Sequence, residues 1–417
     1  MTRSVERGVQ AAFLIGLGVS ITLAQVALAA LVGLWLLRLR DPAARRAFTF
    51  PLARPFLAFI AATLLADLFS ADVAGSLYAS KELALIAVFV VLVNTLPGRD
   101  GAQWLLGSLF LVMVSVSALS LLQVSLCSPE PWQLPLLDRW LRKCTRARGF
   151  YSIYMTLAGV LTLALLASLP QLWRRDSPRL PWKLPGWILM FLALVLTYTR
   201  GAWLGFLAGM GGLIPLAGRR RSLAVLGGSI LLLFVLVAVG SSALSKEIWG
   251  LRNLADPTTF LERLYMWRAG VGMLGQNPVT GIGVGQVKTL YPRYVLPHAM
   301  RRSTSHLHSS PLQVLVERGL LGLGSWLWLW GAYFLRGLRI LNRAGPGLER
   351  ERALVLGSLA AILGFLVSGL SENNFGDSEV VMVAYAVMAI PFLVEPALAG
   401  GVSGTREAGG ARSRSGS

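Results

Sequence analysis

Long apolar runs recur along this chain, and they constrain its fold more than any other feature. Residues 105–122 and 223–239 form two such runs. Each approaches the roughly 20 apolar residues that a helix needs to cross a bilayer core of about 30 Å. The chain has 417 residues, of which 55% are hydrophobic and only 14% are charged, and neither disorder nor a water-soluble core explains these runs. A lone strand in lipid would leave its backbone groups unpaired. The sequence therefore predicts an all-α integral membrane protein.

Basic residues fall in short clusters between the apolar runs, and these clusters predict the topology. The net charge is +19, but no single domain-sized face is basic, which argues against nucleic-acid binding. Short loops rich in Lys and Arg face the cytoplasm. Placing even numbers of crossings between the clusters predicts about twelve spans with both termini cytoplasmic, with eleven spans and an external N-terminus as the alternative. The clusters lie at 38–46, 173–183, 218–221 and 335–352 and in the tail after Pro396.

Two intervals between basic clusters are short for two full spans, and each predicts a hairpin of short helices. Basic clusters on the same side flank the interval 185–216, so the chain must turn back within it. The only polar interruption in this interval is TYTRG, which places Arg200 at the tip of the hairpin near the outer face. Residues 9–37 predict a similar hairpin, broken near 18–20. The N-terminus lacks a small-residue cleavage site, so we expect an uncleaved first helix.

The same reasoning divides the chain into four regions. External loops longer than about 60 residues are exempt from the charge rule, so one large external loop can be basic. The charge of this loop predicts an anion site on the outer face, with solvated surface charges as the alternative. The regions are N-terminal transmembrane helices with the short hairpin (1–240), the large basic loop (241–311), C-terminal transmembrane helices (312–397) and a disordered cytoplasmic tail (398–417).

Two cysteines, Cys127 and Cys144, lie in one loop between spans. A disulfide is permitted there if the loop is outside the cytoplasm, but the spacing does not decide whether the two are bonded.

Arginines near apolar segments are the candidate binding residues. An arginine inside the membrane region costs a few kcal/mol on insertion scales and usually faces a polar cavity, which makes Arg200 a functional candidate. A structural arginine bonded to helix-end carbonyls is the alternative. Arg263 and Trp267 are four residues apart and share a helix face, so Arg263 is expected to point into the cavity and Arg268 to be a neighbour or a surface charge. Guanidinium groups match phosphate oxygens in pairs, which predicts a diphosphate ligand. Arg148 is a further candidate, with a solvated loop charge as its alternative.

All three histidines lie close together, at His298, His306 and His308. A histidine accepts a proton near neutral pH, so His308 is the predicted general base, with a capping or interfacial histidine as the alternative. The sequence leaves the role of His306 open. The spacing H-x7-H-x-H lacks the i, i+4 pair of a zinc helix and has no acidic residue nearby before Glu317, so we predict no metal and no cofactor. The alternating glycines of TGIGVGQ (280–286) predict a tight external turn.

Five sequence blocks, taken together and in order, resemble the O-antigen ligase family, which shares a domain with Wzy-type O-antigen polymerases. The family's (S/T)RG arginine falls on Arg200, its R-L-x-x-W arginine on Arg263 and its histidine on His308. Ser309 stands where the family usually has asparagine, which puts in doubt whatever that amide orients. The blocks are RARGFYSIYMTLAG (146–159), TYTRGAWLGFLAG (197–209), ERLYMWRAGVGMLGQNPVTGIGVGQ (262–286), SHLHSSPLQVLVERGLLGL (305–323) and SENNFGDSEVVM (371–382).

The resemblance implies a metal-independent, inverting glycosyltransferase in the bacterial cell inner membrane, with its site facing the periplasm. The implied donor is a glycan on undecaprenyl diphosphate, and the acceptor is lipid A core or another glycan, in lipopolysaccharide or surface polysaccharide biosynthesis. Arg200 and Arg263 would hold the diphosphate, with Arg268 and Arg148 as further candidates, and His308 would deprotonate the acceptor. A Wzy-type polymerase and, less well supported, a lipid-linked glycan transporter are the alternatives. The sugar, the acceptor and the oligomeric state stay open.

Overall fold

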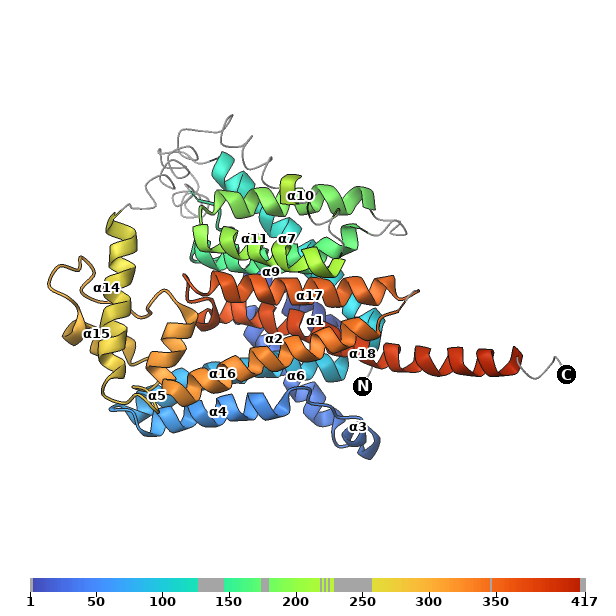
Figure 1. Ribbon diagram of the computed structural model, residues 1–417, viewed down its shortest axis with the longest axis horizontal. Coiled ribbons are helices and arrows are strands. Elements are labelled where there is room, and N and C mark those ends of the chain that lie inside the picture. The colour runs from blue at the N-terminus through green and yellow to red at the C-terminus, as the bar shows by residue number, and fades with distance from the viewer. Residues whose placement is uncertain are drawn as a thin grey trace.

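The computed structural model describes residues 3–126, 146–173, 180–217, 257–345 and 347–412, together with 220, 223 and 226–228. Within these ranges every regular element is helical, which confirms the predicted all-α class for this part of the chain. Most of the long helices run side by side, and α14 crosses one end of this bundle (Figure 1). Cys127, Cys144 and residues 229–256 lie outside the described residues.

The first part of the chain supplies paired helices separated by short polar turns. Ser20 separates α1 from α2, and its hydroxyl accepts a hydrogen bond from the Leu23 N–H, where the sequence predicts a hairpin break. Asp72 caps α5 in the same way through the Gly75 N–H. The elements are α1 (Arg3–Val19), α2 (Ile21–Arg38), α3 (Pro42–Arg46), α4 (Ala53–Leu68), α5 (Val73–Ala79), the 3-10 helix η1 (Ser80–Leu85), α6 (Ile86–Thr95), α7 (Gly98–Ser125), α9 (Tyr154–Leu172), α10 (Leu180–Leu196) and α11 (Arg200–Ala217).

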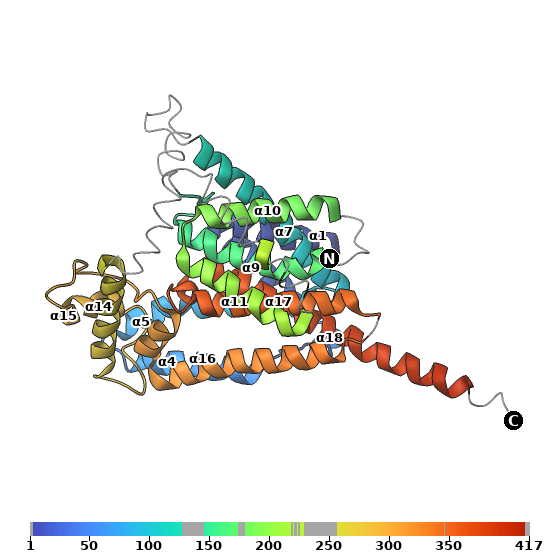
Figure 2. The ribbon, with the colours of Figure 1, turned by 45° about the horizontal axis from the view of Figure 1, so that its top comes forward.

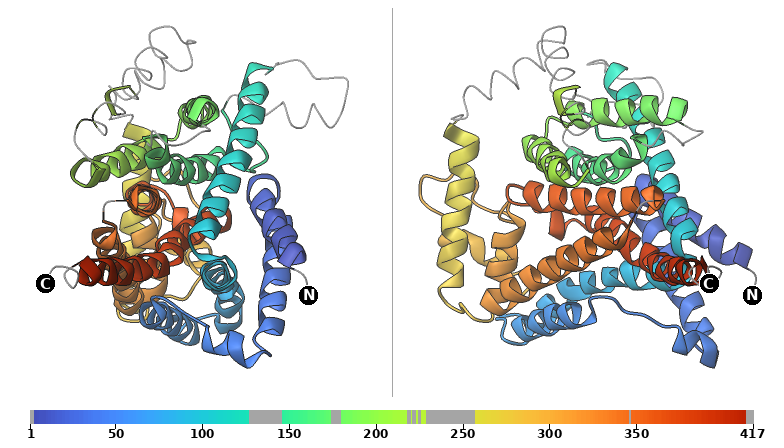
Figure 3. Two further views of the ribbon diagram at one scale, coloured as in Figure 1. Left: turned by 90° about the vertical axis from the view of Figure 1, so that its right-hand side faces the viewer. Right: turned by 45° about the vertical axis from the view of Figure 1, so that its right-hand side comes forward.

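The second part of the chain begins outside the bundle and returns to it. The views from the side show α14 and α15 at one end, while α16, α17 and α18 run through the bundle (Figure 2 and Figure 3). The elements are α14 (Pro257–Leu274), α15 (Val287–Tyr294), α16 (Ser310–Arg343), α17 (Glu349–Ser368), the 3-10 helix η2 (Asn374–Gly376) and α18 (Ser378–Arg412).

Six of the described helical stretches are long and apolar enough to cross a membrane. The helix α10 is apolar but has only 17 residues, and α1, α4 and α11, with 17, 16 and 18 residues, are not among the six. The structure therefore supports a membrane protein with six candidate spans, while the count of about twelve stays a prediction that depends on the short helices. The six are Ile21–Arg38, Val73–Thr95, Gly98–Ser125, Tyr154–Leu172, Glu349–Ser368 and Ser378–Leu398.

Glycines set the distance between the central helices. A Cβ on Gly205 of α11 would lie 2.4 Å from the backbone oxygen of Gly364 in α17, and a Cβ on Gly357 would lie 2.1 Å from the oxygen of Ala167 in α9. Helices in membranes associate through such small residues because close backbone approach gains van der Waals contact where no hydrophobic force drives association. The start of α11 is thereby held against the end of α17.

The helix α16 is broken at Gly319, whose φ of 63° and ψ of −166° are not helical. The glycine-rich segment TGIGVGQ packs against this break. The Gly283 N–H donates to the Glu317 oxygen at 2.9 Å, and the Leu320 N–H donates to the Pro278 oxygen at 3.0 Å. The predicted tight turn is present, and its glycines allow the turn to approach the backbone of α16.

The helix α18 continues past the last candidate span to Arg412. The helix overlaps the tail over 398–417, whose disorder and cytoplasmic location stay predictions.

Candidate functional site

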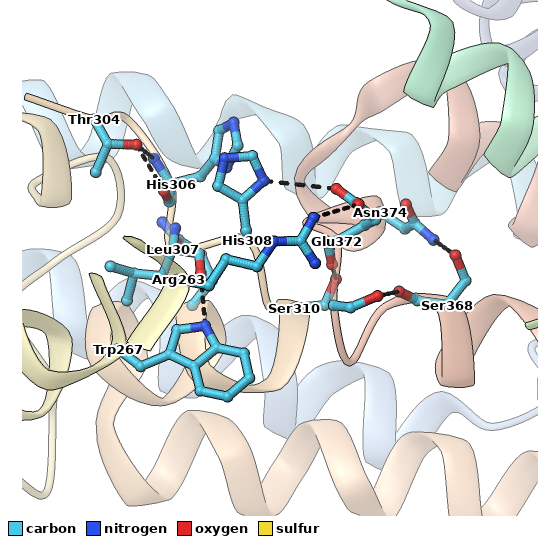
Figure 4. A network of polar contacts seen from close by, with 12 residues as sticks. Arg263, Trp267, Thr304, His306, Leu307, His308, Ser310, Ser368, Glu372 and Asn374 are labelled. Atoms are coloured by element: carbon cyan, nitrogen blue, oxygen red, sulfur yellow. Dashed lines mark hydrogen bonds and ion pairs between the residues drawn. The ribbon is translucent and has the colours of Figure 1, made fainter. Parts of the chain in front are cut away.

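Three segments far apart in the sequence meet at one end of the bundle: α14, the loop before α16 and the loop between α17 and α18. Arg263 Nη2 donates to Glu372 Oε1 at 2.9 Å, and His308 Nδ1 lies 3.5 Å from Glu372 Oε2 (Figure 4). The Glu372 side chain is only 7% exposed. One buried carboxylate thus lies between a guanidinium and an imidazole, an arrangement typical of functional sites.

The loop with Glu372 is fastened to the start of α16. The Ser310 N–H donates to the backbone oxygen of Gly369 at 2.7 Å, and the Ser310 hydroxyl donates to the backbone oxygen of Glu372 at 3.1 Å. The same hydroxyl accepts from the Phe375 N–H at 3.1 Å. Because Ser310 is two residues from His308, these bonds fix the imidazole relative to the carboxylate.

His308 has a backbone conformation that is uncommon for a residue other than glycine. Its φ is 49°, in the left-handed region, and the residue is buried. The neighbouring backbone is held from both sides, since Trp267 Nε1 donates to the Leu307 oxygen at 3.0 Å and the Leu307 N–H donates to Gln313 Oε1 at 2.9 Å. Such a conformation persists when the surrounding structure enforces it, and it is often found where a side chain must be aimed.

The ring of His306 packs against the ring of His308, with centroids 4.2 Å apart and planes at 69°. In Figure 4 it lies beside His308 on the side away from Glu372. Burial, with a smaller contribution from the neighbouring His308, lowers the pKa of His306 to about 4. His306 is therefore neutral near pH 7 and adds no positive charge to the site.

Arg200 is the first residue of α11, directly after the turn 197–199. The structure places this helix start beside the carboxylate, because a Cβ on the next residue, Gly201, would lie 3.6 Å from Glu372 Oε1 and 2.4 Å from Ser371 Oγ. A larger residue at this position would require the Ser371 side chain to move. The N-terminus of a helix carries unpaired N–H groups and a partial positive charge, which suits an anion.

The other two predicted arginines lie at the margin. Arg268 is exposed on α14, one residue beyond the Trp267 that packs inward. Arg148 is half-buried, and burial lowers its pKa. Its neighbour Ala147 donates through its backbone N–H to the Leu196 oxygen at 2.8 Å, so Arg148 lies near the end of α10 and the turn that leads to α11.

Sequence reasoning assigned no role to Glu372. The segment SENNFGDSE was interpreted as a loop joining two spans, and an acidic residue in a loop is usually solvated. The only signal in the sequence was that Glu372 falls within one of the five blocks that carry the family resemblance.

A second pair of an arginine and a glutamate lies at the break in α16. Arg318 Nη1 donates to Glu317 Oε2 at 2.9 Å, and Glu317 Oε1 accepts from Gln313 Nε2 at 2.8 Å and from the Gly285 N–H at 2.9 Å. Arg318 Nε donates to Thr63 Oγ1 at 3.2 Å. Across the described ranges, no three His, Cys, Asp or Glu side chains gather in a way that could hold a metal ion.

The fold and this site define a polytopic helical membrane protein with an arginine, a glutamate and a histidine converging at one end of its bundle. Residues 185–327, about a third of the chain, match the family model described as O-antigen ligase. This match confirms the family resemblance and supports a function of the O-antigen ligase or polymerase type. It spans Arg200, Arg263 and His308 and ends before Glu372. No curated protein matches the chain.

Proposed function

We propose that this protein transfers a glycan from undecaprenyl diphosphate to an acceptor hydroxyl at the periplasmic face of the bacterial inner membrane, with inversion. The proposed process is lipopolysaccharide biosynthesis of the O-antigen ligase type. The observation that carries the proposal is the convergence of Arg263 and His308 on the one buried carboxylate of Glu372. A site for this reaction needs a cation for the leaving diphosphate and a base for the attacking hydroxyl.

In the proposed mechanism Arg263 and Arg200 bind the diphosphate. A guanidinium has five N–H donors, and the contact with Glu372 uses one of those on Arg263, which leaves others for phosphate oxygens. Arg200 adds a second guanidinium at a helix N-terminus, where an anion is favoured. These groups stabilise the negative charge that grows on the diphosphate as its bond to the sugar breaks. Arg148 and Arg268 would act further out, on the headgroup or the glycan.

His308 acts as the general base. Its Nδ1 faces Glu372, so Nε2 points away from the carboxylate and can accept the proton of the acceptor hydroxyl. The hydroxyl oxygen attacks the anomeric carbon from the face opposite the diphosphate, the new glycosidic bond forms, and the bond to phosphate breaks with inversion. Glu372 stabilises the imidazolium and holds the ring in place. Catalytic contacts as long as 3.5 Å often shorten in the complex with substrate.

The proposed step requires no metal ion. Guanidinium groups supply the charge compensation that a divalent cation supplies in other diphosphate enzymes. We therefore expect a chelator to leave the transfer rate unchanged.

Replacing His308 by alanine tests the assignment. We expect the rate of glycan transfer by the purified protein, with a lipid-diphosphate donor in liposomes, to fall by about 10²- to 10⁴-fold, the usual contribution of a general base. His298→Ala is the matched control, because His298 is exposed and lies in the same loop. Transfer that survives His308→Ala would exclude this histidine as the base.

The product identifies the acceptor class. Glycan attached to lipid A core supports a ligase, whereas a longer lipid-linked glycan supports a Wzy-type polymerase. If the wild-type protein moves the lipid-linked donor across the membrane but transfers no glycan to an acceptor, transport replaces glycan transfer as the proposed function.

A further inference from the structure

A cavity of about 380 Å³ opens beside His306. Its walls come from α4, the junction of α5 and η1, the glycine-rich segment, the start of α16 and the loop before α18. His306 lines it, whereas Arg263 and His308 do not. The volume lies at the lower end of the range for small-molecule pockets, about 300–1,000 Å³, so it suits a small part of a substrate.

Basic and acidic side chains line this cavity in equal number. Lys81 and Arg318 are basic, Glu82 and Glu317 are acidic, and His306 is neutral near pH 7 because burial lowers its pKa to about 4. Arg318 and Glu317 already bind each other at 2.9 Å. A diphosphate would gain little here compared with the arginines beyond His308. The cavity therefore favours a neutral ligand.

The remaining wall combines aromatic rings with one carboxylate that has hydrogen-bonding capacity to spare. Tyr78 is 72% exposed, Lys81 Nζ lies 4.1 Å from the centroid of its ring, and Tyr385 and Phe375 also line the cavity. Within the described part of the chain no hydrogen bond reaches the Glu82 carboxyl group, so it can form hydrogen bonds with hydroxyls of a ligand. Flat apolar rings with a few polar groups fit a sugar, which has C–H faces and a rim of hydroxyls.

The geometry of His308 indicates which substrate, donor or acceptor, this sugar belongs to. The two nitrogens of an imidazole diverge, and Nδ1 faces Glu372, so Nε2 faces the side on which the His306 ring lies (Figure 4). An acceptor hydroxyl must reach Nε2, and it can do so from the cavity that His306 lines. We propose that this cavity binds a neutral sugar ring of the acceptor glycan and presents its hydroxyl to His308, with Glu82 accepting hydrogen bonds from neighbouring hydroxyls. The proposal rests on the proposed function for the direction of transfer.

Steady-state kinetics test the assignment to the acceptor. With Glu82→Gln we expect the KM for the acceptor glycolipid to rise about tenfold, the effect of losing one hydrogen bond to a sugar hydroxyl, while the KM for the lipid-diphosphate donor stays within about twofold. Asp100→Asn is the matched control, because Asp100 is 81% exposed and does not line the cavity. A rise in the donor KM with the acceptor KM unchanged would overturn the proposal, and so would no change in either.

A binding measurement separates this proposal from the transfer reaction. Saturation-transfer NMR with the full-length protein in nanodiscs would use neutral methyl hexosides and methyl heptosides as probes. We expect saturation transfer from the wild-type protein to these probes, and we expect it to persist when inorganic diphosphate is added. The Ala79→Trp substitution fills the cavity and should reduce the saturation-transfer signal at least twofold. If the wild-type protein binds the sugar probes but transfers no glycan, the proposed function is contradicted and the sugar site is not. If wild type and Ala79→Trp bind the probes equally, or if neither binds them, the sugar site is contradicted.

Discussion

Two pairs of an arginine and a glutamate lie near each other in this protein. They differ in whether all the hydrogen-bonding groups of the glutamate are occupied. Arg318 and Glu317 are adjacent in the chain and only 9% and 7% exposed, and both oxygens of Glu317 are occupied. Arg263 and Glu372 are 109 residues apart, Arg263 is 24% exposed, and the second oxygen of Glu372 faces a histidine at 3.5 Å. The saturated pair fastens the break in α16, whereas the unsaturated pair has hydrogen-bonding groups to spare, which the proposed mechanism assigns to the substrate.

The largest effect is expected on stability, at the saturated pair. Replacing Arg318 by alanine leaves a buried carboxylate without its cation, which costs about 3–5 kcal/mol. Thermal unfolding of the purified protein should show a strong decrease in the melting temperature. The double variant Glu317→Leu with Arg318→Met should recover part of it, because no charge is left buried. An unchanged melting temperature in Arg318→Ala would remove the distinction between the pairs.

The unsaturated pair should respond in activity. For Arg263→Ala we expect kcat/KM of glycan transfer to fall by about 10²- to 10³-fold, since a donor to the developing charge is lost. The melting temperature should change far less than in Arg318→Ala. Arg263→Lys should recover only part of the activity, because an ammonium is a point charge without paired donors. Full activity in Arg263→Ala would exclude it from the diphosphate site.

In the proposed mechanism Glu372 is a positioning residue, so its replacement should have a smaller effect on activity than that of Arg263. We expect Glu372→Gln to lower kcat by about 10- to 100-fold, as for other groups that orient a reacting side chain. Glu372→Asp should recover part of this loss, because it keeps a carboxylate beside the imidazole. An unchanged kcat in Glu372→Gln would exclude this role.

The smallest effect concerns pH and His306. Burial lowers the pKa of His306 to about 4 from the usual value of about 6.5, so the unfolded chain binds more protons than the folded protein between these values. Stability is therefore highest above pH 6.5 and decreases as the pH falls toward 4. Melting temperatures measured from pH 7 to 4.5 should show this loss, and His306→Gln should reduce the slope. An identical slope in the variant would assign the loss to other groups.

Local features of the sequence predicted the helical framework because charge clusters and apolar length are read directly from neighbouring residues. The hairpin of α1 and α2 breaks at Ser20, where the sequence placed it, and α10 and α11 turn just before Arg200. The break at Gly319 was not predicted. A single glycine in an apolar run is compatible with a continuous helix, and only the approach of the glycine-rich segment shows why this one interrupts it.

The site was predictable only in part, because some of its contacts join residues that are distant in the sequence. Arg263 and His308 belong to recognisable blocks, and the helical spacing indicates that Arg263 turns inward with Trp267. Glu372 could not be assigned, because its importance comes from a contact across 109 residues and from a burial that no neighbouring residue indicates. The helix start at Gly201 joins the site through the same kind of distant contact.

The break at Gly319 also divides α16 into two parts that can tilt independently. The short part, 310–318, is hydrogen-bonded to loops at one end of the bundle, and the long part, 320–343, runs along the bundle. A helix in a bilayer adjusts to membrane thickness by tilting. Because an interruption of this kind acts as a joint, we expect tilting of the long part to leave the histidine and its carboxylate in register. The protein should therefore keep one catalytic geometry in lipids of different acyl-chain length.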